Sequence, residues 1–234
     1  VCAACQRSPS VKRVILRSTA MVYGASASDP SHFSEEIPAK REPTRSYGRD
    51  LLDVEGYFRG LGRRRQDIEV TIMRLQAMLG PRINTRISSY LSLPVVPTVF
   101  GFQPRLQFLH EEDALAAMEH ATLASRPGTF NVAGDGVVTL TQAVRRTGHL
   151  ELPVPGRLLA PITGVLQDLR SAKLRSSQTE FLTYGRVLDT TRMRSELGFA
   201  PRYTTLETLD DYIARSGVTP VISADRWRGL EPVS

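Results

Sequence analysis

Lysine is scarce in this sequence, and it contains no long hydrophobic run. The 234 residues carry a formal net charge of +6, yet Lys12, Lys40 and Lys173 are the only lysines, so the basic residues are almost all arginine. No segment approaches the roughly 20 consecutive apolar residues that a transmembrane helix requires. No basic-then-apolar leader opens the sequence either. We therefore expect a cytoplasmic protein that does not enter a membrane.

The excess of arginine does not by itself indicate nucleic-acid binding. Guanidinium groups pair with two phosphate oxygens at once, so they could serve phosphate-bearing ligands of any size. The basic residues are spread along the chain, however, and the tightest cluster is only 63–65, with no aromatic platform beside it. A basic RNA-associated protein has only the charge in its favour, and salt-sensitive retention on polyanions would support it. We expect no nucleic-acid partner.

Cysteine is almost absent, since Cys2 and Cys5 are the only two. Their C-x-x-C spacing can mark a redox pair or half of a zinc site. A zinc site would need two more ligands, and the four histidines show no paired spacing. We favour a turn of helix with small residues, and we expect no bound metal.

The hydrophobic residues, 41% of the chain, suffice for a packed core and are arranged as alternating strands and helices. Buried strands are predicted at 11–16 and 68–73, with a helix at 47–65 between them, and this order predicts parallel strands. The Ser-, Asp-, Glu- and Pro-rich segment 25–43 is a long loop of the kind that is usually functional. Shorter strands are predicted near 96–100, 106–109 and 129–132, and further helices at 111–124, 140–147, 157–172, 191–197 and 206–215.

Hydroxyl-bearing side chains stand at two places where an α/β sheet binds ligands. Ser18 and Thr19 directly follow the first strand, beyond whose carboxyl end a ligand would lie. Serine and threonine also simply cap strand ends, and this bland alternative stays open. Tyr47 begins the next helix, and a tyrosine there can exchange a proton with a sugar oxygen. Because its pKa is ordinarily about 10, it needs a nearby positive charge to act at neutral pH.

These segments together resemble the extended short-chain dehydrogenase/reductase family, of which UDP-glucose 4-epimerases and dTDP-glucose dehydratases are familiar members. Thr-Ala-Met-Val-Tyr-Gly at 19–24, followed by Tyr-Gly-Arg at 47–49, is similar to two of its motifs. Further segments resemble the family in the same order along the chain: 74–81, 108–114, 128–134 and 196–201.

The resemblance implies an α/β fold. We expect the C-terminal part of a Rossmann-like doubly wound parallel sheet plus a smaller α+β substrate-binding lobe. Residues 1–81 would be the remainder of the dinucleotide-binding domain. Residues 82–234 would form mostly the substrate-binding lobe, with segments returning to the Rossmann-like core. The family commonly dimerises through its tyrosine-bearing helix, so Tyr57, Phe58 and Leu61 are candidates for a homodimer face, although they could equally be ordinary core.

The resemblance also implies an activity, that of an NAD(P)-dependent oxidoreductase of epimerase/dehydratase type acting on a nucleotide sugar or a related hydroxy compound. Tyr47 would be the acid/base, and Thr19 would hydrogen-bond the substrate oxygen. The residues expected to contact NAD or NADP are Ser18, Tyr47 and Leu75. The residues expected to hold the substrate's diphosphate are Gln76, Arg82, Arg86 and Arg105, of which the arginines supply positive charge.

The chain departs from the family pattern at three positions. The family has a lysine four residues after the tyrosine, which lowers the tyrosine's pKa and holds the cofactor ribose, and here that residue is Leu51. A substrate-contacting asparagine is replaced by Ala77. The family's phosphate-binding arginine lies four residues before the histidine, where this chain has Leu106. These departures support an alternative, a non-catalytic binding or regulatory protein that keeps the fold without the Tyr-x-x-x-Lys chemistry.

A glycine-rich phosphate turn is also missing, since no G-x-G-x-x-G occurs. Such a turn lets the pyrophosphate of a dinucleotide approach a helix N-terminus. About a hundred residues of the family's N-terminal half have no counterpart here, by analogy with a typical dinucleotide-binding half. We therefore expect either a piece of a longer polypeptide or a protein that does not bind NAD by itself.

Overall fold

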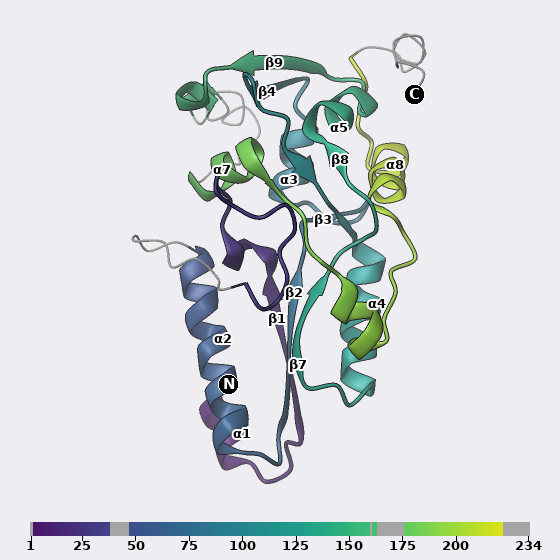
Figure 1. The fold of residues 1–234 in the computed structure, drawn as a ribbon. Helices are drawn as coiled ribbons and strands as arrows, with labels where there is room; N and C mark the ends of the chain where they lie inside the picture. The colour runs from purple at the N-terminus through teal and green to yellow at the C-terminus, as the bar shows by residue number, and fades with distance from the viewer. Residues whose placement is uncertain (1, 38–46, 160, 163–175, 222–234) are drawn as a thin grey trace.

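The computed structural model describes residues 2–37, 47–159, 161–162 and 176–221, and it confirms the predicted α/β fold class with parallel strands (Figure 1). A parallel sheet in the order β1-β2-β7 joins β1 (Arg13–Thr19), β2 (Glu69–Leu75) and β7 (Gly128–Val132). Helix α2 (Tyr47–Arg64) packs on one side of this sheet and α4 (Glu111–Leu123) on the other (Figure 1). The βαβ unit predicted from the sequence is therefore present.

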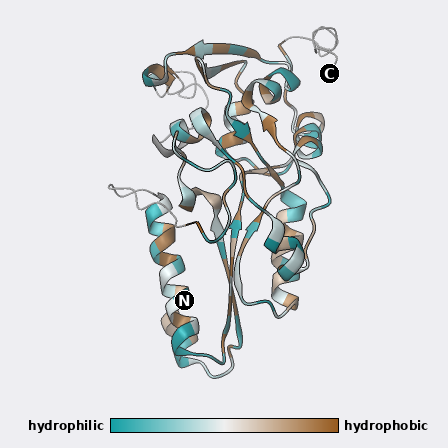
Figure 2. Cartoon of the chain, viewed as in Figure 1, coloured by the Kyte–Doolittle hydropathy of each residue, from teal (hydrophilic) through white to brown (hydrophobic). Residues whose placement is uncertain are grey.

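Helix α2 is amphipathic and directs one stripe toward the sheet. Phe58 and Leu61 on this stripe are buried, whereas Tyr57 is 69% exposed. Hydrophobic and hydrophilic residues follow one another along the helix, as expected for a helix with one face in water (Figure 2). Phe58 and Leu61 thus belong to the core of this chain, and only Tyr57 of the three candidate dimer residues is exposed. A homodimer stays a prediction.

The second region, drawn above the first sheet in Figure 1, is built from short strands. Its sheets are β10-β5-β8, β3-β6 and β4-β9. The strands are β3 (Met78–Leu79), β4 (Val95–Val99), β5 (Arg105–Leu106), β6 (Leu109–His110), β8 (Val138–Thr139), β9 (Leu150–Val154) and β10 (Gly185–Arg186). Helices α3 (Arg86–Leu91), α5 (Leu140–Arg146), α7 (Ser176–Tyr184) and α8 (Thr205–Arg215) pack around them.

One large apolar cluster forms the core of this second region. Its fully buried members include Leu79, Leu91, Leu106 and Phe108. A second cluster lies between α4 and the first sheet, and β7 lies within it although it follows residue 82 in the chain. The division into two domains at residue 81 stays a prediction.

Several elements differ from the sequence-based expectations. Strand β9 was not predicted, because it contains Pro153 and proline is rare inside strands. The β4-β9 sheet has only two strands, so each strand has an open edge, where a residue without an N–H is tolerated. The helix expected at 191–197 is a short π-helix, η2 (Met193–Leu197), which ends at Gly198 in the left-handed region. Most of the helix expected at 157–172 lies outside the described residues.

The N-terminal helix α1 (Cys2–Arg7) carries both cysteines as free thiols, and none of its residues is fully buried. A turn of helix was predicted here. Among the described residues, no group of three histidine, cysteine or acidic side chains could hold a metal ion. In the same part of the chain, no helix has both the length and the apolar character needed to cross a membrane.

Candidate functional site

A cavity of 480 Å³ opens where strands β1 and β2 end. Parallel sheets place ligand sites at their carboxyl ends, because the loops that follow neighbouring strands converge there. The strand ends contribute Ser18, Thr19, Leu75 and Gln76 to the walls, and α2 contributes Leu51. Helices α3 and α7 and strand β10 close the other side with Arg86, Ile87, Tyr90, Phe181, Leu182 and Arg186. The cavity therefore lies between the first sheet and the second region.

The two hydroxyls at the end of β1 have different surroundings. Ser18 is buried, and its Oγ donates to Oε1 of Glu55 over 2.6 Å. Thr19 is the N-cap of the 3-10 helix η1 (Ala20–Tyr23), and its Oγ1 accepts from the Met21 amide at 3.3 Å. Among the described residues the Thr19 hydroxyl donates no hydrogen bond, so this group can still donate to a ligand in the cavity. Both the capping role and a ligand role are therefore compatible with Thr19.

Beneath the cavity, a row of polar side chains crosses the sheet. Ser18 pairs in register with Arg74, and Arg74 with Asn131, so the three side chains lie on the same face of β1, β2 and β7. The carboxylate of Glu55, on α2, accepts two hydrogen bonds from Arg74. Arg74 Nε donates to Glu55 Oε1 at 3.1 Å, and Arg74 Nη2 donates to Glu55 Oε2 at 2.8 Å. This two-point geometry is the strongest form of an arginine–carboxylate pair.

Tyr23 completes the row. Its hydroxyl accepts from Arg74 Nη1 at 2.8 Å and donates to Asn131 Oδ1 at 2.8 Å. Burial raises the pKa of Tyr23, and the neighbouring guanidinium of Arg74 only partly offsets this, so the phenol stays protonated and remains a donor. We define the polar row as Ser18, Tyr23, Glu55, Arg74 and Asn131. It binds α2 directly to β1 and β2, and to β7 through Arg74 and Tyr23.

The contacts of Glu55 with the sheet also position the start of α2, where Tyr47 and Leu51 lie. Tyr47, Leu51 and Glu55 are spaced four residues apart, so they share one helical face, and eight residues span about 12 Å along the axis. Leu51 lines the cavity, and an apolar side chain therefore occupies the place where the family has its lysine. Tyr47 begins α2, but its side chain lies outside the described residues.

Gln76 faces the cavity but is itself committed to backbone groups. Its Nε2 donates to the carbonyl of Arg186 at 3.0 Å, and its Oε1 accepts from the Ala77 amide at 3.0 Å. Gln76 is buried, so losing either bond would leave a polar group without a partner. The side chain therefore links the end of β2 to β10 and fixes the backbone of Arg186.

Positive charge reaches the cavity from three elements. Arg17 of β1, Arg86 of α3 and Arg186 of β10 line it, and the described lining residues include no carboxylate. Arg17 and Arg86 are solvent-exposed, whereas Arg186 is buried. A cavity with guanidinium groups and no acidic side chain in its described walls suits an anionic ligand.

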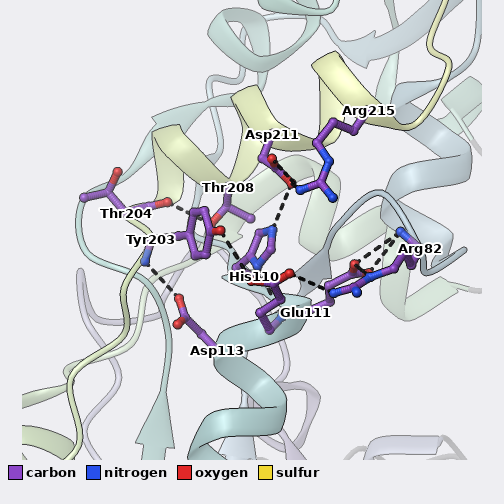
Figure 3. A network of polar contacts seen from close by, with 10 residues as sticks. Arg82, His110, Glu111, Asp113, Tyr203, Thr204, Thr208, Asp211 and Arg215 are labelled. Atoms are coloured by element: carbon purple, nitrogen blue, oxygen red, sulfur yellow. Dashed lines mark hydrogen bonds and ion pairs between the residues drawn. The ribbon is translucent and has the colours of Figure 1, made fainter.

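Arg82, which the sequence analysis assigned to the substrate, lies elsewhere. Figure 3 shows its guanidinium against the start of α4, where Nε donates to Glu111 at 2.8 Å and Nη2 donates to Glu112 at 2.8 Å. The same view shows the buried His110, which caps α4 and contacts Asp211 of α8 at 3.2 Å. Arg82 lines a separate cavity and holds α4 in place.

Arg105 also lies outside the main cavity. It is exposed, its Nη2 donates to the Ser31 carbonyl at 3.2 Å, and it lines a smaller cavity of 180 Å³. Of the residues predicted to bind cofactor or substrate, the structure brings Ser18, Thr19, Leu75, Gln76 and Arg86 to one cavity and leaves Arg82 and Arg105 apart.

Arg17, Glu55 and Arg186 were not among the residues predicted from the sequence. A local signal existed for Glu55, which interrupts an apolar helical stripe at the spacing of Tyr47 and Leu51. No local signal existed for Arg186, because its position depends on strand pairing between segments far apart in the chain.

Solved structures confirm the fold. A UDP-glucuronic acid 4-epimerase from Bacillus cereus in complex with NAD superposes with a TM-score of 0.62 and 16% identity, over 92% of this chain and 64% of that one. A UDP-N-acetylglucosamine 4-epimerase from Methanobrevibacter ruminantium in complex with UDP-N-acetylmuramic acid gives a TM-score of 0.66 and 16% identity, over 91% of this chain and 64% of that one.

Sequence relatives and a family model define the membership. Uncharacterized proteins of Mycobacterium tuberculosis and Mycobacterium bovis are each 49% identical over 229 residues, which is 98% of this chain. The chain spans 61% of the length of these relatives. Residues 1–133 match the model of the NAD dependent epimerase/dehydratase family. The chain therefore belongs to the NAD dependent epimerase/dehydratase family.

Proposed function

We propose that this protein takes part in an NAD(P)-dependent reaction of epimerase/dehydratase type, and that the cavity at the ends of β1 and β2 binds a nucleotide sugar or a related hydroxy compound. One observation carries the proposal: Thr19, which has a strand-end hydroxyl, and three arginines line the same cavity. The hydroxyl suits a sugar oxygen, and the guanidinium groups suit phosphates.

The residues present fit the nicotinamide end of the cofactor. Leu51, Leu75 and Met21 offer apolar wall beside Thr19, against which a flat ring can pack. When bound, a nicotinamide supplies the hydride acceptor for a sugar carbon. The structurally similar epimerase from Bacillus cereus was solved with NAD, which supports this choice of cofactor.

The chain's own residues then have defined tasks. Thr19 donates a hydrogen bond to the substrate oxygen, and its Oγ1 accepts from the Met21 amide at the same time. Tyr47 takes the proton from the hydroxyl that is oxidised. The polar row holds α2, and with it the start of the helix, at the strand ends.

The second candidate is a binding or regulatory protein that keeps the fold without turnover. Leu51 favours it, because an apolar side chain in the cavity wall neither lowers the pKa of a tyrosine nor binds a ribose hydroxyl. The two candidates differ in chemistry and agree on the ligand.

Kinetics on the full-length protein separate them. NAD(H) binding and turnover of UDP-sugars are measured for the wild type and for Tyr47→Phe, Thr19→Val and Leu51→Lys. The enzyme candidate predicts a loss of about 100- to 10,000-fold in kcat for Tyr47→Phe and a higher kcat, or a pH optimum shifted to lower pH, for Leu51→Lys.

Arg105→Gln is the matched control, because Arg105 lines a different cavity and should leave kcat unchanged. Turnover that survives Tyr47→Phe would remove that residue from the proton transfer. Binding of UDP-sugars without turnover, in both the wild type and Leu51→Lys, would establish the second candidate.

A further inference from the structure

We infer that Arg186 of β10 supplies the guanidinium that binds the diphosphate of the ligand, in place of an arginine from β5. This inference rests on the proposed function and names a residue of the same site.

Strands β5 and β10 pair in parallel, and Arg186 stands directly beside Leu106. Neighbours in register direct their side chains to the same face of a sheet. Leu106 occupies the position at which the resembling family carries its phosphate arginine, and here it is fully buried in the apolar cluster. A guanidinium on the adjacent strand can therefore serve the same side of the sheet.

The alternative within β5 is not supported by the geometry. Arg105 is one residue away from Leu106, and a shift of one residue along a strand directs the side chain to the opposite face. Arg105 indeed donates to the Ser31 carbonyl and lines the smaller cavity. Arg186 borders this smaller cavity too, but of these two arginines only Arg186 also lines the main cavity.

Contacts to the Gly24 carbonyl, the Phe181 ring and Gln76 help to position Arg186. Its Nε donates to the Gly24 carbonyl at 2.8 Å, its guanidinium lies 5.3 Å from the centre of the Phe181 ring, and its carbonyl accepts from Gln76. A guanidinium already positioned by a ring and by a hydrogen bond loses little further freedom when a ligand binds, which favours affinity.

Gly185 makes this placement possible. Its φ is 75°, and a Cβ added there would lie 2.3 Å from the Arg105 carbonyl oxygen. Only glycine permits both this backbone conformation and this close approach of β10 to β5. The turn from α7 into β10 therefore delivers Arg186 to the wall of the cavity.

Arg17 and Arg86 complete the electrostatic environment. They line the same cavity from β1 and α3, so a diphosphate with at least two negative charges meets several guanidinium groups. Arg186 differs from both because it is 6% exposed as a whole residue, and a charged hydrogen bond is stronger where water is excluded. Arg186 should therefore contribute more to phosphate affinity than either exposed arginine.

A purely structural role is the competing explanation, since the bond to Gly24 also ties β10 to the segment after η1. Ligands of graded charge distinguish the two. Affinities for UDP, UMP and uridine are measured by isothermal titration calorimetry on the full-length wild type and on Arg186→Met, Arg186→Lys and Arg105→Met, with thermal midpoints recorded in parallel.

Arg186→Met should weaken UDP binding by about 10- to 100-fold and leave uridine binding unchanged. Arg186→Lys keeps the charge and should recover part of the UDP affinity. Arg105→Met should match the wild type for all three ligands. The salt dependence of UDP binding should also become shallower in Arg186→Met, which a loss of structure alone would not produce.

Equal losses for UDP and uridine, or an unchanged UDP affinity in Arg186→Met, would overturn the inference while leaving the proposed function in place. Failure of the wild type to bind either UDP or UDP-sugars would contradict the proposed function and this inference together. If Arg186→Met does not fold, the ratio of UDP to uridine affinity in Arg186→Lys decides: a ratio equal to that of the wild type counts against a fork-shaped guanidinium contact.

Discussion

The two sides of the candidate cavity are held together by different physical means. Between α2 and the first sheet, side chains bind side chains: the polar row contains a two-point ion pair between Glu55 and Arg74, both buried. In the second region, the core is a large apolar cluster whose polar atoms bind backbone, as Tyr212 does to the Ser88 carbonyl at 2.9 Å.

This difference has a consequence for precision. An apolar cluster tolerates small displacements, because dispersion and the hydrophobic effect are not directional. A row of hydrogen bonds between fixed side chains permits only one axial position of α2 against β1, β2 and β7. The position of α2, the helix that begins at Tyr47, is therefore specified by directional contacts with the sheet.

The largest effect should follow from breaking the polar row. Glu55→Leu leaves the buried Arg74 without its carboxylate partner, and removing one member of a buried pair costs about 3–5 kcal/mol of unfolding free energy. Urea denaturation of the variant and the wild type measures the difference.

Two further variants sharpen this prediction. Glu196→Gln breaks the exposed pair between Glu196 of η2 and Arg192, the residue that precedes η2, and such pairs contribute at most about 1 kcal/mol. The double variant Glu55→Leu/Arg74→Met removes both buried charges and should recover most of the loss. A Glu55→Leu variant as stable as Glu196→Gln would show that the row contributes little, and that the comparison between the two regions is wrong.

The long, strongly patterned elements could be predicted from the sequence, and for clear physical reasons. The helix at 47–65 and the strands that flank it carry their burial pattern locally, and α2 begins and ends within one residue of the prediction. The two-residue strands β8 and β10 have no such pattern. Their existence depends on partners distant in sequence, so no window of neighbouring residues could reveal them.

The same distinction applies to the candidate site. Thr19 follows a recognisable strand, and its motif placed it at the cavity in advance. Arg186 enters the cavity only because Gly185 brings β10 against β5. Arg82 and Arg105 lie in the sequence near the expected diphosphate site, yet Glu111 and the Ser31 carbonyl hold them elsewhere. Sequence proximity is thus a poor guide where short strands determine direction.

A smaller effect should follow from a cavity in the apolar cluster. Leu91 is fully buried at the end of α3, and Leu91→Ala should lower the unfolding free energy by about 3 kcal/mol, since truncation removes both burial and packing. Leu115→Ala is the matched control, because Leu115 on α4 is 69% exposed and its truncation should change stability by no more than about 0.5 kcal/mol.

The position of α2 provides a sharper readout for the same pair of regions. Glu55→Leu should reduce turnover more than Leu91→Ala does when both variants are assayed at a temperature where each remains folded. Only Glu55→Leu removes contacts that position α2 on the sheet. Equal reductions in kcat would mean that the polar row has no special part in positioning the helix.

The smallest effect concerns Glu35, whose Oε1 accepts from the Asn131 amide at 2.7 Å at the edge of the polar row. Partial burial raises the pKa of this carboxyl from its ordinary 4.5, and the hydrogen bond from Asn131 offsets this only in part. The folded state therefore holds the proton more firmly than the unfolded state. The stability that Glu35 contributes is fully present below pH 4.5, and it is lost as the pH rises through the higher pKa that Glu35 has in the folded state.

Glu35→Gln removes this titration and keeps an oxygen that can accept from Asn131. The difference in unfolding free energy between Glu35→Gln and the wild type should grow in favour of the variant as the pH rises above 4.5, and should then level off at less than about 1 kcal/mol, because the group is only partly buried. Glu36→Gln makes the same change of charge on an exposed neighbour and is the control for the loss of one negative charge. Comparing each variant with the wild type at every pH is essential, because carboxylates such as Asp189, whose pKa is lowered by hydrogen bonds from Thr191, contribute with the opposite sign. A difference that is flat between pH 4 and pH 7, within the reach of ordinary carboxyl titration, would mean that Asn131 and its neighbours accommodate the Glu35 charge at no cost, and that the edge of the polar row is as tolerant as the apolar cluster.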